Sequence, residues 1–593
     1  MHPTQPRKDI TVKETRDHVP YETPEWAKHV IWYQIFPERF HNGDPSNDPT
    51  AKRVKGPEGW EISPWTGDWY ERADWEQQLG PGFRDGVFYR RYGGDIQGIL
   101  DKLDYIEELG IGALYLNPVF DAVSLHKYDT SHYRHVDRHL GPDPEGDAEI
   151  IEQEDPSDPS TWQWTAADKL FLELVDEVHS RGMKIIIDGV FNHTGTDFWA
   201  FRDIIRKQKD SDFRDWYDIV SFDDPSTEQN EFKYHGWWGV KDLPEFRSMN
   251  GSLHEPVKEH IFEITRRWMD PDGDGDPSDG VDGWRLDVPE EVGQDFWIEW
   301  CSHVRSINPE AFIVGEIWTG NAVHYVNKEQ FDSVMNYRFS ATVQDYMIDR
   351  DIDVEEFSHR LDKIRESFPD EANYVMQNLM ESHDTPRLAS MIVNPGRKFD
   401  HWGKPQDGFN VRKPNEQERK IQRLIALLQY TYVGTPMIFY GTEAGIWGAD
   451  DPDDRKPMVW PEMEFEIEDN HPLPDESRPA DANFFDHGLF NWYKKLGEIR
   501  NSHELLRTGR YRNLLCRDDL FTFARYEEGS DPIVVILNRS DEKKAVELDL
   551  SELSSLPDAF SRLLGEGTAS VNLSDNGKIR VELEPVSGEI LVL

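Results

Sequence analysis

Arg285 and Asp287 stand two residues apart in the short apolar segment GWRLDV (283–288). Apolar, β-prone residues between acidic, Gly-rich flanks predict a buried strand. Side chains two positions apart on a strand point to the same side. A carboxylate beside a permanent cation is expected to keep a low pKa and to stay ionised. Such a carboxylate is the nucleophile that attack on a sugar carbon requires.

Two further apolar segments also end in acidic residues. FIVGEIW (312–318) contains Glu316 near its end, and NLMESHD (378–384) ends in His383 and Asp384. Three predicted strands that each carry an acid at the end indicate one active site assembled from several strand termini.

Eight short apolar segments alternate with stretches of helical periodicity along most of the chain. This alternation predicts a closed (β/α)8 barrel, in which functional residues lie at the carboxyl ends of the strands. Asp188, Asp287, Glu316 and Asp384 all lie at or near such ends. The predicted strands are residues 30–36, 113–119, 184–191, 283–288, 312–318, 333–337, 378–384 and 436–443.

Several segments lie outside this pattern. Residues 49–90 follow the first strand and are rich in Trp, whereas residues 121–164 and 444–485 are acidic. From residue 506 to residue 593, short alternating runs predict a small antiparallel β-domain. We therefore expect an N-terminal arm (1–25), a barrel domain (26–505) and a C-terminal β-domain (506–593).

The composition limits the possible partners. The 593-residue chain has a formal net charge of −49, which disfavours binding to nucleic acids and to anionic membranes but not to a neutral glucan. Two cysteines cannot support a disulfide framework. Without an apolar leader or a long apolar stretch, a cytoplasmic location is expected, or a periplasmic or secreted one if a leader was removed. The oligomeric state is left open.

Four motifs occur in a fixed order: DGVFNH (188–193), GWRLDV, GEIW (315–318) and SHD (382–384). With them the chain resembles the α-amylase family of glycoside hydrolases (family 13). HKYDT (126–130) and WYQIFPERFHNGD (32–44) resemble its neopullulanase, cyclomaltodextrinase and maltogenic amylase branch. The resemblance implies a catalytic TIM barrel, a domain B inserted after the third strand, placed at about residues 121–164, and a C-terminal β-sandwich.

The sequence departs from that branch in two places. Members usually begin with a separate starch-binding module, whereas here the barrel begins almost at once. LPEF (243–246) stands where the branch often carries MPKLN-like sequence. The Trp residues of the 49–90 segment fit loop packing, or alternatively a substitute for the starch-binding module.

The family resemblance also implies residue roles. Asp287 would be the nucleophile, Glu316 the acid and base, and Asp384 a third carboxylate that holds sugar hydroxyls. Retaining cleavage requires two carboxyl groups about 5–5.5 Å apart. The expected substrate contacts are Arg285 beside the nucleophile, Asp188 that orients Arg285, His193 and His383 that bind hydroxyls, Tyr128 as an aromatic platform, and Trp238 as a stacking surface.

HNGDPSND (41–48) gathers oxygen-bearing side chains in one loop. Asn42, Asp44, Asn47 and Asp48 offer the ligands that Ca²⁺ prefers. The resemblance implies that Gly93 and Asp95 complete a structural Ca²⁺ site, and an Asx-rich turn is the alternative. The loop 270–280, with Asp270, Asp272, Asp274 and Asp276, is either a second Ca²⁺ loop or a solvated acidic loop. Neither metal would be catalytic.

By resemblance, the expected activity is retaining hydrolysis of α-1,4-glucosidic bonds, and possible substrates are malto-oligosaccharides, cyclodextrins, pullulan and starch. Cleavage of α-1,6 bonds is compatible with the same site. An α-glucosyl transferase or isomerase is an alternative, because it would use the same three carboxylates. A non-catalytic glucan-binding relative is a third hypothesis, disfavoured because Asp287, Glu316 and Asp384 are all retained.

Overall fold

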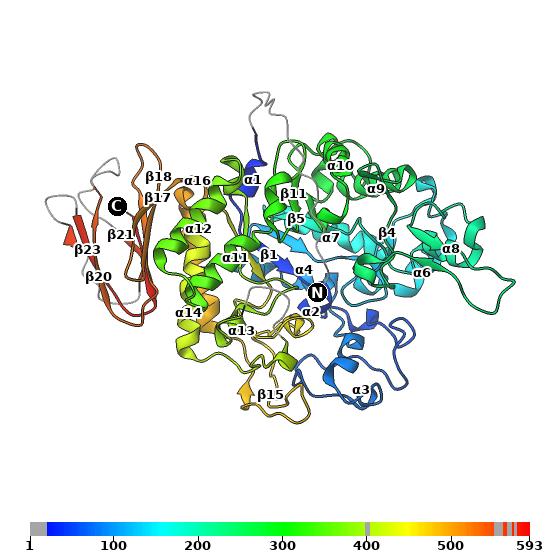
Figure 1. Cartoon of the computed structure of the whole chain (residues 1–593), viewed down its shortest axis with the longest axis horizontal. Helices are drawn as coiled ribbons and strands as arrows, with labels where there is room; N and C mark the ends of the chain where they lie inside the picture. Colours follow the sequence, from blue (N-terminus) through cyan, green and yellow to red (C-terminus); the bar gives the residue numbers. More distant parts are fainter. Residues whose placement is uncertain (1–20, 398–403, 551–560, 566–571, 574–577, 593) are drawn as a thin grey trace.

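The computed structural model describes residues 21–397, 404–550, 561–565, 572–573 and 578–592. Eight parallel strands form a barrel at its centre (Figure 1). Each strand pairs with the next along the chain, the last pairs with the first, and a bridge between Met335 and Gln377 closes the ring. The strands are β1 (Trp32–Ile35), β2 (Ala113–Leu116), β5 (Lys184–Gly189), β10 (Gly283–Leu286), β11 (Phe312–Gly315), β12 (Ser333–Val334), β13 (Gln377–Leu379) and β14 (Thr435–Phe439).

All eight predicted strands overlap these barrel strands. The observed strands end earlier at their carboxyl ends, so Asp287, Glu316 and Asp384 lie just beyond the regular hydrogen-bonded ladder, whereas Asp188 lies within β5. The predicted fold class, a TIM barrel followed by a C-terminal antiparallel β-sandwich, is confirmed.

The barrel interior changes from apolar to polar along the strands. Trp32 on β1 stacks on Phe312 of β11, four strands away around the ring, with ring centroids 5.2 Å apart. These side chains therefore fill the middle of the barrel. Because side chains alternate along a strand, the next inward positions are Gln34 on β1 and Asp188 on β5, so polar groups gather at the carboxyl ends.

Helices cover the outside of the barrel and bury the outward-facing strand residues, such as Leu114, Ile187 and Leu286. Within the described residues, no helix is both long enough and apolar enough to span a membrane. The long covering helices are α7 (Ala166–Ser180), α9 (Glu255–Met269), α10 (Gln294–Ile307), α12 (Val354–Glu366), α14 (Glu416–Thr431) and α15 (His487–Ser502).

The position of the insertion differs from the sequence-based expectation. Residues 121–164 contain most of the hairpin β3–β4 (Phe120–Ala122 and Thr130–Val136) and α6 (Pro144–Gln153), and they follow the second barrel strand. The third strand, β5, is instead followed by residues 190–254, with α8 (Trp199–Lys207) and the hairpins β6–β7 (Ile219–Ser221, Lys233–Tyr234) and β8–β9 (Ser248–Met249, Ser252–Leu253). HKYDT lies before the strand that carries DGVFNH, so it cannot mark an insertion after that strand.

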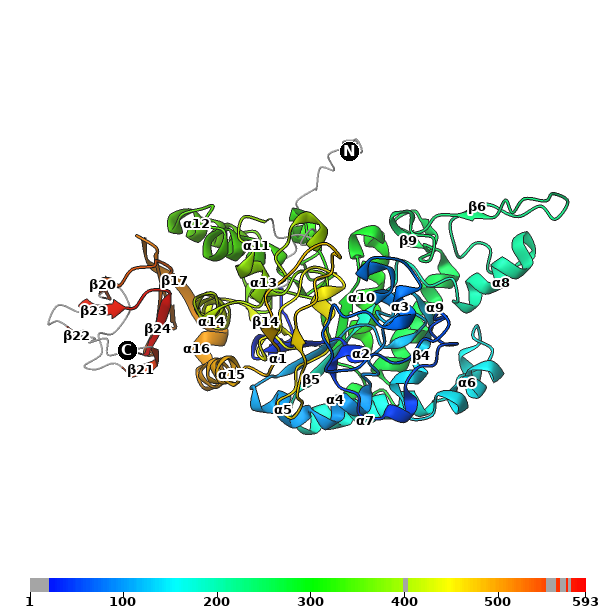
Figure 2. The ribbon, with the colours of Figure 1, turned by 90° about the horizontal axis from the view of Figure 1, so that it is seen from below.

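Two antiparallel sheets lie at the opposite end of the molecule from α8 (Figure 2). One contains β17 (Arg510–Arg517), β18 (Leu520–Tyr526), β19 (Ile533–Asn538), β24 (Ser587–Val592) and β21 (Ser561–Gly565). The other contains β20 (Lys544–Asp549), β23 (Lys578–Leu583) and β22 (Asn572–Leu573). Val534, Ile536, Val546 and Val581 pack in one apolar cluster. The division at residues 505/506 stays a prediction.

The sandwich is fixed to the barrel by buried cations that bind backbone carbonyls. The guanidinium of Arg525 on β18 donates to the carbonyls of Thr431 and Tyr432, each at 3.0 Å, at the end of α14. Arg500 on α15 donates to the carbonyl of Tyr430 on α14 at 2.9 Å and to that of Leu506 at 3.0 Å. The bonds to α14 satisfy carbonyls that the end of this helix leaves without helical partners.

Replacement of Gly283 by Ala should destabilise the barrel. Gly283 has φ +155°, and a Cβ there would lie 2.0 Å from the carbonyl oxygen of Phe312 on the neighbouring strand. We expect the free energy of unfolding, measured by urea denaturation, to fall by about 3 kcal/mol because of overpacking and backbone strain. The control is Gly320→Ala, where nothing lies within 4 Å of the new Cβ. Equal stability of the two variants would contradict this account of β10.

Candidate active site

The guanidinium of Arg285 binds three carboxyl groups that come from three neighbouring strands. Its Nη1 lies 2.9 and 3.0 Å from the two oxygens of Asp188 on β5, and 3.0 Å from Oδ1 of Asp287, which follows β10. Its Nη2 lies 2.9 Å from Oε2 of Glu316, which follows β11. Asp287 and Glu316 are 7% and 8% exposed. The structure thus brings both predicted acids to one cation at one end of the barrel.

The strand ladder sets the positions of Asp287 and Glu316. The Asp287 N–H donates to the carbonyl of Gly189 at 3.2 Å, and the Glu316 N–H donates to that of Leu286 at 3.0 Å. Both residues therefore continue the register of the barrel. Their side chains point inward because they follow Arg285 and Val314 by two positions.

Local strain and one indole orient the Glu316 carboxyl group. Val288 has φ 37°, a left-handed conformation that is a true outlier for a β-branched residue. This turn directs the Val288 N–H to Oε2 of Glu316 at 3.2 Å. The other oxygen, Oε1, accepts from the indole N–H of Trp318 at 2.8 Å, and Trp318 stacks on Tyr337 with centroids 3.5 Å apart.

Asp384 is the most accessible of the three predicted catalytic acids, with 26% of its side chain exposed. Its Oδ2 lies 3.2 Å from Nε2 of His383, and its Oδ1 accepts from Nη2 of Arg455 at 3.2 Å. Arg455 also donates to the carbonyl of His383 at 2.7 Å and contacts Oδ1 of Asp451 at 3.2 Å. Arg455 therefore joins Asp384 to the acidic segment that follows β14.

A hydrogen-bonded chain determines the state of His383. The Gln34 amide donates to Nδ1 of His383 at 2.8 Å, so Nδ1 is the acceptor nitrogen. Burial lowers the pKa of His383 well below its ordinary value, and the ring is neutral. The single proton therefore resides on Nε2, which faces the Tyr128 hydroxyl and Asp384.

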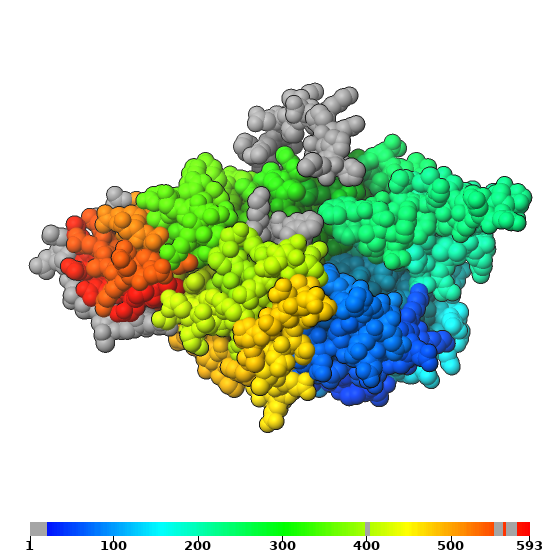
Figure 3. Space-filling view, turned by 60° about the horizontal axis from the view of Figure 1, so that its bottom comes forward, coloured from blue at the N-terminus to red at the C-terminus, as the bar shows by residue number. Residues whose placement is uncertain are grey.

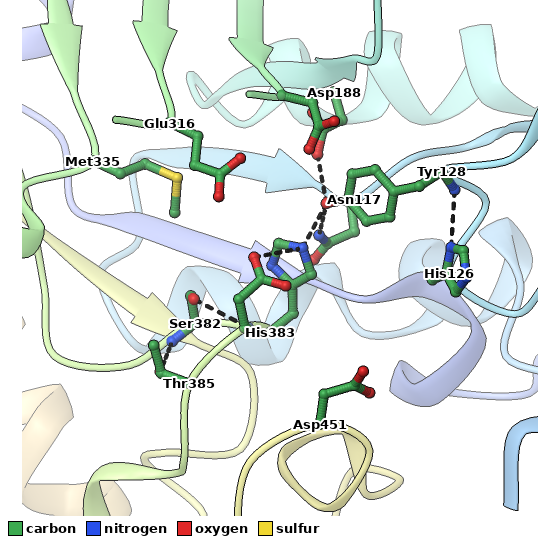
Figure 4. A network of polar contacts seen from close by, with 12 residues as sticks. Asn117, His126, Tyr128, Asp188, Glu316, Met335, Ser382, His383, Thr385 and Asp451 are labelled. Atoms are coloured by element: carbon green, nitrogen blue, oxygen red, sulfur yellow. Dashed lines mark hydrogen bonds and ion pairs between the residues drawn. The ribbon is translucent and has the colours of Figure 1, made fainter. Parts of the chain in front are cut away.

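Tyr128 connects His383 to the carboxylate bound by Arg285 (Figure 4). Its hydroxyl donates to Oδ2 of Asp188 at 3.0 Å and accepts from the Asn117 amide at 3.2 Å. The Tyr128 and His383 rings are parallel within 5°, with centroids 5.5 Å apart. A second hydroxyl, that of Tyr115, donates to the same Asp188 oxygen at 2.8 Å.

His193 begins a stack of three rings that ends at the surface. It stacks on Trp237 with centroids 5.5 Å apart, and Trp237 stacks on Trp238 at 5.2 Å. Trp238 is 77% exposed, and its indole donates to Glu291 at 3.3 Å. Burial lowers the pKa of His193 to about 3, and its Nε2 has no hydrogen-bond partner among the described residues. That nitrogen is buried beneath the stacked rings.

The expectation of a low pKa for Asp287 is wrong. Burial raises the pKa of Asp287 well above its ordinary value, Arg285 opposes this, and the charge of Glu316 raises it further. The reason is that Arg285 is shared: its single charge faces Asp188 and Glu316 as well. The spacing in the sequence predicted that Arg285 lies beside Asp287. It did not show how many other acids would bind the same guanidinium.

Asp384 shows the same effect. Burial, followed by the charge of Glu316, raises the pKa of Asp384 to about 7, while Arg455 and Arg285 lower it. Five carboxyl groups, those of Asp188, Asp287, Glu316, Asp384 and Asp451, thus face two guanidinium groups at the barrel mouth. The cluster retains a proton near neutral pH, which acid catalysis by one of its members requires.

The predicted Ca²⁺ loop has two kinds of members. Asp95 caps α4 (Ile96–Asp101), and its two oxygens accept four hydrogen bonds, from Gly43, Gly98, Asp44 and Asn47. Asp44 accepts from the N–H and hydroxyl of Ser46, as an Asx turn does. Both residues organise the loop.

The other members leave oxygens available. The amide oxygens of Asn42 and Asn47 are buried and have no partner among the described residues. Oδ1 of Asp48 accepts from the Asn42 amide at 2.9 Å, and burial raises the Asp48 pKa to about 6. Gly93, with φ +76°, leaves room that Asp48 occupies, since a Cβ there would lie 1.9 Å from its oxygen. These oxygens fit a hard cation.

The acidic loop 270–280 lies on the surface. Carboxylate oxygens of Asp270, Asp272 and Asp279 come within 4.8 Å of one another. Asp272, like Asp274 and Asp276, which were also named from the sequence, accepts from the backbone N–H group two residues ahead. This pattern is that of consecutive Asx turns.

The Trp residues of the 49–90 segment pack against other side chains and are not exposed to solvent as a binding surface would be. Trp60, Trp69 and Trp75 are 9%, 2% and 3% exposed. Trp65 is half-buried and donates to the carbonyl of Met458 at 2.8 Å. Packing, the first of the two interpretations, is what the structure supports for these rings.

Several residues of the site were not recognised from the sequence. Gln34 and Asn117 are polar residues at inward positions of predicted strands, and that alternation was a usable signal. Trp318 was visible within GEIW. Arg455 and Asp451 lie in an irregular acidic segment, where no periodicity indicates which side chains turn toward the barrel.

Comparisons with known proteins agree with this arrangement. The family model "Alpha amylase, catalytic domain" matches residues 34–153 and 165–509. Neopullulanase 2 of Thermoactinomyces vulgaris is 35% identical over 573 residues, covering 96% of this chain and 79% of that protein. An amylopullulanase of Thermoanaerobacter thermohydrosulfuricus is 32% identical, and the chain spans 37% of its length.

A solved structure is similar over almost the whole chain. It is the cyclic α-maltosyl-(1→6)-maltose hydrolase of Arthrobacter globiformis in complex with cyclic α-maltosyl-(1→6)-maltose. The two are 26% identical, with a TM-score of 0.69, and the alignment covers 96% of this chain and all of the other.

Asp384→Asn should stabilise the protein, more at high pH than at low pH. The folded-state pKa of about 7 lies above the ordinary value of 3.8, so folding favours the protonated acid. Stability is lost as pH rises from the lower value to the higher one. We expect the free energy of unfolding of Asp384→Asn, measured by urea denaturation, to exceed that of the wild type by about 2 kcal/mol at about pH 8 and by less at about pH 5.5. A loss of stability at both pH values would contradict the electrostatic account.

Proposed function

The chain belongs to the alpha-amylase family, and on that premise we propose that it hydrolyses α-1,4-glucosidic bonds with retention of anomeric configuration. The observation that carries this proposal is that Asp287 and Glu316 meet the two terminal nitrogens of one buried guanidinium. Two carboxyl groups held so close to a common cation suit nucleophile and acid on either side of one glycosidic bond.

In the first half of the reaction, an oxygen of Asp287 attacks the anomeric carbon and forms a glycosyl ester. Glu316 gives its proton to the leaving glycosidic oxygen. Glu316 is then ionised, and the N–H groups of Val288 and Trp318, which both donate to it, stabilise that charge. In the second half, Glu316 takes a proton from water, and the hydroxide oxygen displaces Asp287 from the sugar.

With the proton of the cluster on Glu316, Asp287 is ionised, and Arg285 stabilises its charge before attack and after the ester is cleaved. As the Asp287 charge is consumed, Asp188 and Glu316 remain as partners for the guanidinium. Arg285 therefore keeps acidic partners throughout the catalytic cycle. An unpaired buried cation would cost free energy, and this cost does not arise here.

The remaining predicted residues suit a neutral sugar. The Nε2 proton of His383 can bind a hydroxyl group, His193 would do so at the base of its ring stack, and Asp384 would accept from two adjacent hydroxyls. The Tyr128 ring supplies an apolar face at the cleavage point. Trp238 is a platform at the rim, where a further glucose unit stacks.

For the substrate we propose malto-oligosaccharides first, then pullulan and cyclic α-glucans. The names of the neopullulanase and of the cyclic maltosyl-maltose hydrolase support pullulan and cyclic α-glucans as substrates. A net charge of −49 does not repel an uncharged glucan. Glucosyl transfer uses the same carboxylates and is distinguished by its products. The cytoplasmic location stays a prediction.

We also propose a structural Ca²⁺ ion in the loop 42–48. Asn42, Asn47 and Asp48 would supply oxygens, and the Gly93 carbonyl would complete the set. When bound, the ion would supply positive charge that offsets the buried Asp48 carboxylate and would join this loop to the start of α4. The unpartnered amide oxygens of Asn42 and Asn47 support the proposal.

Activity should depend on both central acids. We expect Glu316→Gln to lower kcat for maltotriose by about 10²–10⁴-fold and Asp287→Asn to abolish detectable turnover. The matched control is Asp295→Asn, an exposed acid on α10. NMR of the first product should show the α-anomer. A β-anomer, or wild-type turnover by Asp287→Asn, would refute the proposed mechanism.

Ca²⁺ should raise the thermal midpoint of the wild type, and a chelator should reverse this. Stabilisation would be about 2.7 kcal/mol at a free Ca²⁺ concentration of about a hundred times Kd. Asp48→Asn should remove the response, whereas Asp272→Asn, in the loop 270–280, should retain it. Loss of the response in Asp272→Asn alone would place the ion in the other loop.

A further inference from the structure

The Trp-rich segment (49–90) binds the acidic segment (444–485) that follows β14. The indole N–H of Trp69 donates to Oδ1 of Asp453 at 2.9 Å, and the hydroxyl of Tyr70 donates to Oδ2 at 3.0 Å. Trp69 and Tyr70 are only 2% and 4% exposed, and Asp453 is also buried. Both oxygens of one carboxylate are therefore held by two adjacent residues of a different segment.

Other bonds join the same two segments. The guanidinium of Arg84 donates to the carbonyl of Asp451 at 3.0 Å. Oδ2 of Asp68 accepts from the N–H groups of Asp469 and Asn470, each at 2.9 Å. The two segments lie side by side on the surface, blue against yellow in Figure 3. Together they form one wall beside the barrel mouth.

The anchored carboxylate lies in the same short turn as a residue of the active site. Asp453 and Arg455 belong to a single 3₁₀ turn, η14 (Asp453–Arg455). Arg455 is 7% exposed, and its guanidinium binds Asp384 Oδ1, the His383 carbonyl and Asp451. A shift of this turn would therefore move the cation away from Asp384.

We propose that Trp69 and Tyr70 are positioning residues for Asp384, because they hold Asp453 and thereby keep Arg455 against the Asp384 carboxylate. The proposal rests on the proposed function in one respect, namely that Asp384 takes part in turnover. It assigns to the Trp-rich segment a role in the chemistry of the site, in place of glucan binding by its tryptophans.

The electrostatics of Asp384 supply a signature of this role. Arg455 is the cation whose charge most lowers the Asp384 pKa, against burial and the charge of Glu316. If Arg455 moves away, Asp384 becomes harder to ionise, and the acidic limb of the pH–rate profile moves to higher pH. A residue that contributes only packing would change the thermal midpoint and leave that limb in place.

The test uses the full-length protein with Tyr70→Phe, which removes one hydroxyl and keeps the ring, and with the double variant Trp69→Phe/Tyr70→Phe. We expect kcat/KM for maltotriose to fall by about tenfold in the double variant, since a displacement of about 1 Å can cost about a hundredfold. The acidic limb of kcat/KM should move to higher pH in both variants.

Trp60→Phe is the matched control. Trp60 lies in the same segment, is 9% exposed and donates to the Tyr89 carbonyl at 2.8 Å, within a separate aromatic cluster. The Trp60→Phe variant should have the same dependence of kcat/KM on pH as the wild type. Wild-type kcat/KM and an unmoved acidic limb in Trp69→Phe/Tyr70→Phe would overturn the proposal.

Hydrogen exchange separates this proposal from the proposed function. Amide exchange of residues 450–456 should be faster in Tyr70→Phe than in Trp60→Phe, whatever the substrate. If the wild type cleaves no α-glucan, the proposed function is refuted, but the proposed anchoring of residues 450–456 is not. The hydrogen-exchange rates of these residues would still test the anchoring. Unchanged exchange in Tyr70→Phe would refute the anchoring itself.

Discussion

One buried guanidinium, that of Arg285, organises the mouth of this barrel. It sits where the interior changes from apolar to polar, and it is bound by Asp188, Asp287 and Glu316 from three consecutive strands. Parallel strands in register deliver these groups to one level, so their convergence follows from the barrel itself. Burial and the charges of the neighbouring acids raise the pKa of Asp287 well above its ordinary value, although Arg285 opposes this. The site's acid–base capacity arises from this balance of burial and charge.

The loops beyond the strands adapt that electrostatic centre to a ligand. Val288 adopts a left-handed conformation immediately after Asp287, and Trp238 does so where it stands exposed beside the site. Backbone strain of about 1–3 kcal/mol per residue persists only where surrounding structure enforces it, often at functional sites. The Trp-rich and acidic segments add a second layer of control. They bind each other, and Arg455 transmits their packing to Asp384.

Much of this arrangement could be predicted from the sequence because it depends on short-range periodicity. Alternation along strands placed Arg285 and Asp287 on one side, and the eight apolar segments predicted the barrel. The pKa of Asp287 could not be predicted in the same way, because it depends on how many acids share Arg285. Arg455 was missed because irregular segments carry no periodic signal. The insertion after the third strand was misplaced because a motif was used in place of the chain order of the strands.

The central claim is that Asp287 and Glu316 act as a pair across one glycosidic bond. The most direct test is to incubate Glu316→Gln with α-maltosyl fluoride, whose leaving group needs no acid, and to analyse the peptides by mass spectrometry. The account predicts that a maltosyl group accumulates on the peptide containing Asp287, because no base remains to activate water. Label on another carboxylate, or none while fluoride is still released rapidly, would contradict it.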